Sequence, residues 1–367
     1  MRKNTVLFIL LFSIAPGLCR AQFRKYSNEF LNIGAGARGL AMGSAQVASV
    51  NDGTAGYWNP AGLTGVQDDP EINAMHAEYF AGIGKFDYLS LALPIQDNRR
   101  TLALSFLRFA VDDIPNTLFL IDPDGRPNYN NIQTFSSADY GVLMSYAQTL
   151  TDDDYRKISF GVNAKIIHRK VGSFARAWGF GIDAGVQMHG DRWKLGIVAR
   201  DLTSTFNAWS FRFTEKEKEV LYLTNNEIPV KSTELTAPRL VLGGSYDFPI
   251  SAKLSLMAEA NLNLTFDGKR NTLVSSKAVS VDPSLGLEAD INNTFYIRAG
   301  INNFQQALAD GDTLNQKKVW IYQPSLGAGV KIKNVTIDYA YSNLANQSNP
   351  LYTHVFSLKF NLAKKQH

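Results

Sequence analysis

Cysteine is almost absent from this chain of 367 residues. The single one, Cys19, lies in an apolar N-terminal stretch, and the remainder of the sequence has none. Charge is nearly balanced, with 37 basic and 33 acidic residues. The first absence excludes a small secreted domain held together by disulfides. The second leaves no basic footprint for nucleic acid, so we expect no nucleic-acid partner.

Long apolar runs are also missing beyond the N-terminus. Two basic residues precede the run TVLFILLFSIAPGL, which is followed by CRAQ. This is the pattern of a secretory signal, so we expect residues 1–21 to be removed by cleavage after Ala21. Removal would lower the net charge from +4 to +1, because three of these residues are basic. Lipidation of Cys19 is the lesser alternative, because Leu18 replaces the small residue that precedes a lipidated cysteine.

The stretch AWGFGIDAGVQMHG shows what the exported part contains instead. Trp178, Phe180 and Ile182 alternate with Gly179 and with other glycine or polar positions. Alternation with a period of two predicts a strand with one apolar and one polar face. No later stretch reaches the ~20 apolar residues of a membrane helix. A soluble exported protein and a membrane β-barrel both remain compatible with that absence.

Alternating runs of this kind recur along the chain, and most reach the ~9–11 residues that cross a bilayer as a strand. We count fourteen, near 71–80, 85–94, 100–110, 137–150, 155–168, 176–189, 191–201, 237–248, 252–265, 279–290, 293–301, 318–331, 333–342 and 351–362. Several connections are very short, whereas four are long: 111–136, 202–236, 266–278 and 302–317.

Long strands with alternating short and long connections are typical of an outer-membrane barrel. A soluble β-sandwich would alternate too, but with shorter strands and no such asymmetry. We therefore predict an all-β fold, a 14-stranded antiparallel transmembrane β-barrel over 71–362, with a basic tail at 363–367 and both termini in the periplasm. Polar inner faces containing Asp183, Glu288 and Arg298 predict a salt-bridged lumen.

The segment 22–70 lacks this alternation and is rich in small residues. A barrel of this size is too wide to be filled by the side chains of its own wall, so we expect this segment to plug the lumen. Trp58 would anchor it. Asn59 before Pro60 is biased to an extended backbone, and Gly62 can adopt a positive φ, so GYWNPAGL predicts a rigid elbow before the first strand. An ordinary turn is the alternative.

Two stretches, FLNIGAGARGLAMGSAQVAS and GTAGYWNPAGL, resemble the N-terminal signature of the PorV/PorQ family, which belongs to the FadL-like superfamily of outer-membrane barrels with a plug. The match covers 30–63 densely. The residues that carry it are Arg38, Gly39, Met42, Gly43, Asn59, Pro60 and Ala61. The resemblance implies a component of the type IX protein secretion system that binds secreted cargo or secretion-system subunits. The ending NLAKKQH departs from barrels that finish on an aromatic residue.

Apolar side chains gather in the two longest connections, and such surface usually covers or binds something. They are Leu118, Phe119, Leu120 and Tyr129 in the first, and Trp209, Phe211, Phe213 and Tyr222 in the second. We expect these residues either to fold over the barrel mouth as a lid or to bind a partner protein.

No motif in the sequence predicts catalysis, a cofactor or a metal. GAGARG lacks the surrounding strand–helix–strand unit of a nucleotide site, and the five histidines show no metal-ligand spacing. We therefore expect a non-enzymatic outer-membrane protein without cofactor, active in secretion. The alternative is a FadL-like uptake channel for hydrophobic small molecules, which requires an apolar pocket. A lipid hydrolase at the rim has no motif in its favour.

Overall fold

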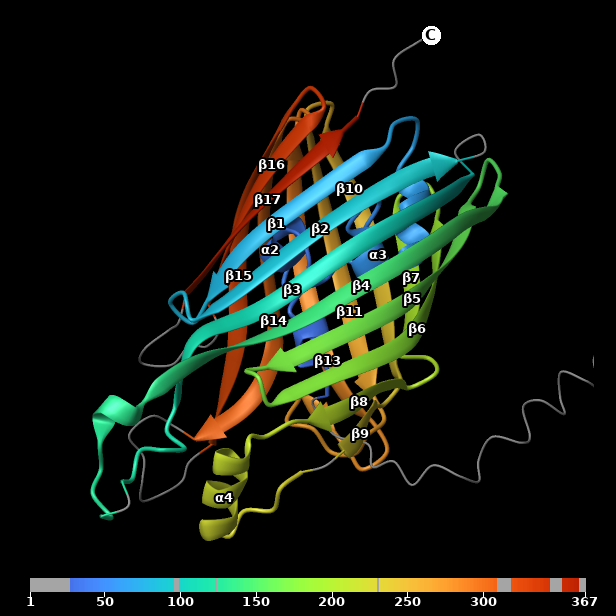
Figure 1. Cartoon of the computed structure of the whole chain (residues 1–367). Helices are drawn as coiled ribbons and strands as arrows, with labels where there is room; N and C mark the ends of the chain where they lie inside the picture. Colours follow the sequence, from blue (N-terminus) through green and yellow to red (C-terminus); the bar gives the residue numbers. More distant parts are fainter. Residues whose placement is uncertain are drawn as a thin grey trace, which may run out of the picture.

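The computed structural model describes residues 27–95, 99–122, 124–229, 231–308, 318–343 and 352–362. The signal peptide and basic tail predicted from the sequence lie outside these residues. The described chain is a closed antiparallel β-barrel of fourteen wall strands, strongly tilted and surrounding short helices of the N-terminal segment (Figure 1). None of the described helices is long and apolar enough to cross a membrane.

The wall strands follow one another around the barrel in chain order. They are β1 (Glu71–Tyr79), β2 (Gly84–Ile95), β3 (Arg100–Asn116), β4 (Gln133–Asp152), β5 (Lys157–Val171), β6 (Ala175–His189), β7 (Trp193–Arg200), β10 (Arg239–Ser251), β11 (Leu254–Thr265), β13 (Ser280–Ile291), β14 (Phe295–Leu308), β15 (Lys318–Ile332), β16 (Val335–Asn343) and β17 (Tyr352–Asn361). The last strand pairs with the first from Glu71↔Asn361 to Glu78↔His354. Closure removes every free edge along this seam, as strands in lipid require.

Burial in this barrel is inverted relative to a soluble protein. Leu104, Ile297 and Leu326 expose more than half of their surface on the outer face, whereas Ser105 and Arg298 on the inner face are buried. The outward apolar positions are those that alternate in the sequence. Such a surface is stable only against lipid, which identifies the chain as a transmembrane barrel of the outer-membrane type.

Two wall strands are interrupted at one end of the barrel. β6 pairs with β7 over 184–189 and then with β8 (Thr205–Phe211) over 175–180, so β8 continues the line of β7 after a break at 201–204. β9 (Lys231–Thr236) pairs with β8 and precedes β10. The break is compact, because Leu202 N donates to Ile182 O at 2.8 Å and two residues, Asp201 and Ser204, have positive φ.

The prediction that 111–136, 202–236 and 302–317 are loops is wrong in part. β3, β4 and β14 extend past the predicted ends, with register shifts between Val111 and Ile114 and between Asn302 and Gln305. There the sequence becomes polar on both faces, so the alternation disappears although the hydrogen-bond ladder continues. The span 202–236 contains β8, the helix α4 (Glu215–Leu223) and β9.

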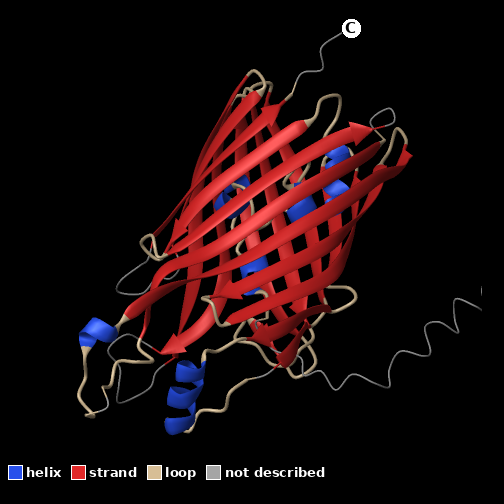
Figure 2. Cartoon of the chain, in the orientation of Figure 1, coloured by secondary structure: helices blue, strands red, loops and turns tan. Residues whose placement is uncertain are grey.

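The remaining short elements are η3 (Tyr129–Asn131) and β12 (Val274–Ser275) outside the wall, and η1 (Glu29–Asn32), α2 (Ala37–Ala41), α3 (Ala55–Trp58) and η2 (Pro60–Gly65) before it. The residues 27–66 are called the N-terminal segment below. Its helices lie inside the barrel, whereas α4 projects from the end that carries the long connections (Figure 2). β17 ends at the opposite end of the barrel (Figure 1).

Candidate functional site

The chain passes from α3 to η2 at Trp58 and Asn59 of the N-terminal segment. Trp58 Nε1 donates to Ala35 O at 2.7 Å, and its ring packs edge-on against Tyr57 with centroids 5.0 Å apart. Asn59 is extended, with φ −154°, as expected before proline. Its fully buried amide donates to Val47 O at 2.9 Å and to Val186 O of the wall at 3.2 Å, so it connects two parts of the segment to β6.

Pro60 opens η2, where proline is favoured because its missing N–H needs no partner. Ala61 follows it and donates its N–H to Asn59 Oδ1 at 3.2 Å. The prediction that Gly62 uses a positive φ is wrong, because its φ lies outside that region. The position instead requires glycine because a Cβ there would overlap the carbonyl oxygen of Val50.

Glycines on the inner wall allow the backbone of the segment to approach closely. A Cβ on Gly161 of β5 would overlap the backbone of Pro60. Gly43, with φ +62°, lies so near β14 that a Cβ would be 2.6 Å from Ile301 N. The same close approach to the segment is found at Gly185, Gly196, Gly243, Gly286, Gly300 and Gly327. The inward-facing positions of these wall strands are therefore small, and together they form a groove that accommodates the N-terminal segment.

Arg38 of α2 fixes the segment to another strand of the wall, β13. It donates to both carboxylate oxygens of Glu288, at 2.8 and 2.9 Å. Arg298 donates to Glu288 at 2.5 Å and to Asp338 at 2.6 Å. Two arginines and two carboxylates thus neutralise one another out of water, an arrangement in which loss of one member leaves a buried charge unpaired.

Two neighbours of Arg38 in the predicted motif pack tightly as well. Met42 is fully buried, and a Cβ on Gly39 would lie 2.7 Å from the ring of Trp58. All nine residues of the predicted plug and elbow motif therefore lie in the N-terminal segment inside the barrel: Arg38, Gly39, Met42, Gly43, Trp58, Asn59, Pro60, Ala61 and Gly62.

A second buried charge cluster lies at the break between β7 and β8. Lys165 Nζ contacts Asp183 Oδ1 at 2.7 Å and also pairs with Asp201. Thr205 Oγ1 donates to Asp201 Oδ1 at 2.6 Å, and Arg239 Nη2 lies 3.5 Å from Asp201 Oδ2. The cluster spans the break, since Asp201 directly follows β7 and Thr205 is the first residue of β8.

Asp52 makes a third link between segment and wall. Lys359 Nζ of β17 lies 3.6 Å from Asp52 Oδ2, and Thr54 N and Oγ1 donate to Asp52 Oδ1 at 2.9 and 2.5 Å. Burial alone would raise the pKa of Asp52, but Lys359 and the hydrogen bonds from Thr54 outweigh burial and hold it below its ordinary value. The carboxyl is therefore ionised at neutral pH.

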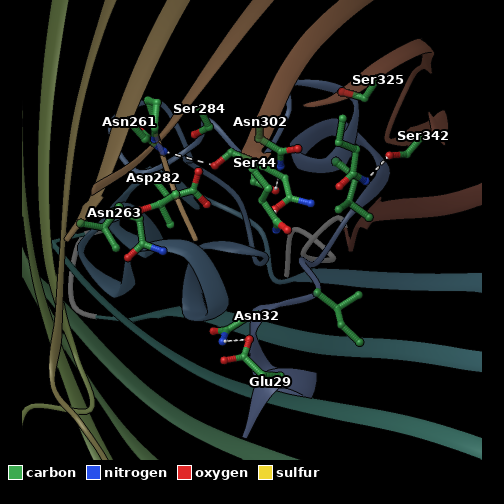
Figure 3. Close-up of a pocket in the computed structure, with 18 of the residues that line it drawn as sticks. Glu29, Asn32, Ser44, Asn261, Asn263, Asp282, Ser284, Asn302, Ser325 and Ser342 are labelled. Atoms are coloured by element: carbon green, nitrogen blue, oxygen red, sulfur yellow. Dashed lines mark hydrogen bonds between the residues drawn. The ribbon is translucent and has the colours of Figure 1, made fainter. Parts of the chain in front are cut away.

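A cavity of about 670 Å³ remains between the segment and the wall. One side is formed by β11, β13, β14 and β15, whose inward side chains here are amides, hydroxyls and one carboxyl (Figure 3). Those shown include Asn261, Asn263, Asp282, Ser284, Asn302 and Ser325. The opposite side is aromatic, with Trp58 of the segment and Tyr79, Phe80 and Phe109 of β1, its following turn and β3.

Several oxygens on the amide side are buried without a hydrogen-bond partner among the described residues. They are Oδ1 of Asn261, Asn263, Asp282 and Asn302. The amide nitrogens of Asn261 and Asn302 are used, since they lie 3.2 Å from Ser44 O and 3.5 Å from Ser44 Oγ. Buried polar atoms are normally satisfied, so acceptors of this kind around a cavity are met by water or by a solute that donates hydrogen bonds.

The apolar residues predicted to bind partners occupy different environments. Trp209 and Phe211 are wrongly placed in a loop: they lie on β8, where alternation faces them inward, and Arg169 lies 5.2 Å from the Trp209 ring centre. Leu118, Phe119, Leu120 and Phe213 are half-buried, and Phe213 stacks on Phe174 at 5.9 Å. Only Tyr129, 74% exposed, and Tyr222, 78% exposed, are open among the eight predicted residues.

The cavity amides were not among the residues singled out from the sequence. Asn261 and Asn263 are at the polar positions of the alternating stretch LSLMAEANLNL, so the sequence predicts that they face the inside of the barrel. Their assembly with Asn302 could not, because it depends on the register of β11 with β13 and of β13 with β14. Within the described residues, no group of three or more His, Cys, Asp or Glu side chains is placed to hold a metal ion.

No protein-family model matches the sequence, and no curated protein matches it. Solved structures do match the fold. The toluene transporter TbuX of Ralstonia pickettii has 13% identity and a TM-score of 0.57, over 90% of this chain and 98% of its own. The monoaromatic hydrocarbon channel CymD has 13% identity and a TM-score of 0.57, over 91% and 99%. The toluene transporter TodX of Pseudomonas putida has 13% identity and a TM-score of 0.56, over 90% and 98%.

The chain therefore shares the closed barrel fold of these three structures. The three are named as transporters or channels. The comparisons lend no support to the narrower PorV/PorQ resemblance or to a role in type IX secretion.

Proposed function

We propose that the chain is an outer-membrane uptake channel for small molecules. The observation that carries the proposal is the cavity of about 670 Å³ inside a closed barrel, between wall and N-terminal segment. This volume falls within the ~300–1,000 Å³ of small-molecule sites. The similar barrels TbuX, TodX and CymD are named for the transport of toluene or monoaromatic hydrocarbons. They support the uptake alternative over secretion.

In this proposal the N-terminal segment is the plug. Its links to β6, β13 and β17 through Asn59, Arg38 and Asp52 hold it against the wall, and a solute passes when part of it moves. Both termini are periplasmic, as an even number of strands requires of a barrel with its long connections outside.

The test is uptake by a Gram-negative host that lacks its own channels for the solutes used. Toluene and small sugars are supplied outside, and their entry is compared between cells that express the protein and cells that carry the empty vector. Faster entry of either class supports the channel. Entry that is equal for every solute, with the barrel folded in the outer membrane, overturns it.

A second candidate is a secretion role that uses the exposed end of α4. Thr214 caps this helix, and Tyr222 and Leu223 at its other end are 78% and 72% exposed. Exposed apolar side chains of this kind serve as anchors at protein interfaces. The variant Tyr222→Ala/Leu223→Ala should then lose a secreted or translocon protein that the wild type retains in an outer-membrane pull-down, while Lys216→Ala retains it. No such protein in the wild-type sample counts against this candidate.

A further inference from the structure

We propose that the cavity binds a neutral polyhydroxylated solute, of the oligosaccharide class, rather than a hydrocarbon. The inference rests on the proposed function and names the substrate class of that same site. It starts from the four unpartnered acceptors on the amide side: Oδ1 of Asn261, Asn263, Asp282 and Asn302. Asn261 is 3% exposed, so its acceptor faces the protein interior rather than bulk water.

A hydrocarbon cannot satisfy these acceptors. Toluene has no hydrogen-bond donor, and placing it against them would leave them desolvated, which is costly for each one. Hydroxyl groups both donate and accept. A ring that carries several hydroxyls can donate to the Asn oxygens and accept from neighbouring hydroxyls such as that of Ser284, which also lines the cavity.

The charges around the cavity favour a neutral solute. Three arginines and two carboxylates, Glu29 and Asp282, line it. Each arginine has a partner within the protein, although the Nε of Arg239 has none among the described residues. Arg200 lies over the Tyr57 ring at 5.2 Å, Arg239 lies 3.5 Å from Asp201, and Arg270 donates to Asp267 at 2.6 Å. Charges of both signs therefore line the cavity, which favours a neutral solute over one with a large net charge of either sign.

The aromatic side of the cavity fits the same class. Trp58, Tyr79 and Phe109 lie across the bore from β11–β14, because β1 and β3 are on the opposite arc of the barrel. Sugar rings present apolar C–H faces between edges of hydroxyl groups. An aromatic surface facing an amide surface can therefore hold the face and the edges of one ring together, with specificity from the polar groups.

The test measures binding and passage separately with the full chain. Purified protein is titrated with a panel of neutral trisaccharides (maltotriose, cellotriose and mannotriose) by calorimetry, and proteoliposome swelling reports their entry. Asn261→Leu and Asn302→Leu each remove an acceptor from the cavity. Asn130→Leu, on an exposed connection, is the matched control.

We expect at least one trisaccharide to bind the wild type, about tenfold weaker binding in each cavity variant, equivalent to about 1.4 kcal/mol, and unchanged binding in the control. No binding by any trisaccharide, or equal binding in all variants with folded barrels, overturns the inference. Uptake of toluene in the absence of sugar binding overturns it while leaving the channel in place. Sugar binding without entry of any solute overturns the proposed function instead.

Discussion

A disulfide between segment and wall tests whether the segment must move for solutes to pass. Gly56 of α3 faces Ser145 of β4, and a Cβ built at Gly56 lies 3.9 Å from Ser145 Cβ. Disulfides need a Cβ–Cβ separation of about 3.5–4.5 Å, so Gly56→Cys/Ser145→Cys satisfies this requirement. The only native cysteine, Cys19, lies in the predicted signal peptide and would not compete.

The expected magnitude follows from the length of the closed loop. About 90 residues separate the two positions, for which the chain-entropy estimate is about 4–5 kcal/mol. That value describes unfolding of the whole chain, whereas detachment of α3 from an intact wall is blocked covalently for as long as the bond is present. Solute entry that requires α3 to leave β4 should therefore fall by more than about tenfold, which a flux measurement resolves.

The assay compares solute entry into proteoliposomes for the oxidised and the reduced double variant. We expect entry to fall at least tenfold on oxidation and to recover with reductant, whereas Gly56→Cys alone and Ser145→Cys alone behave like the wild type in both conditions. Equal flux in the oxidised and reduced double variant, with the disulfide verified by mass spectrometry, would refute movement of α3 as part of transport.

Three further predictions concern stability. Glu288→Gln leaves two buried guanidinium groups short of a carboxylate, so a loss of about 3–5 kcal/mol is expected in urea unfolding, with no loss for the exposed Glu227→Gln. Asp52 has a lowered pKa, so its contribution is present above the unfolded value near 3.9 and is lost as pH falls through the folded value; unfolding of Asp52→Asn below about pH 4 should depend less on pH than that of the wild type. Leu104→Arg faces lipid and should cost about 2–4 kcal/mol on folding into bilayers if it lies near the midplane, unlike Leu273→Arg on a connection.

The wall was predictable because lipid and lumen impose opposite polarity on alternate residues. In β6, Phe180 is exposed whereas Asp183 and Gln187 are buried, as their positions in the sequence alternation require. This signal does not depend on pairing partners, so fourteen strands could be found one at a time. The alternation is lost where both faces of a strand meet water. The predicted C-terminal ends of β3 and β14 therefore fall before the observed ends.

The elements missed in 202–236 had weaker signals. α4 begins with Thr214, whose side chain and Glu217 form a reciprocal capping box, and this T-x-x-E pattern is visible in the sequence. β8 is seven residues long. The sequence predicts a loop there because β7 ends at Arg200 and β8 continues its line only after the break. The cavity was least predictable, since it joins side chains from strands that meet only through the register of the closed barrel.

The distribution of polarity inside the barrel separates this chain from what its fold alone suggests. The ion clusters around Glu288 and Asp201 are internally neutralised, so they hold the segment and the strand break without requiring a ligand. The amide side of the cavity is different, because the side chains that carry its unpartnered acceptors line a space that a solute can occupy. A fold shared with hydrocarbon transporters at 13% identity determines the arrangement of the wall strands, but it does not determine which side chains line the cavity. The solute class must therefore follow from the lining, and the lining calls for hydrogen-bond donors.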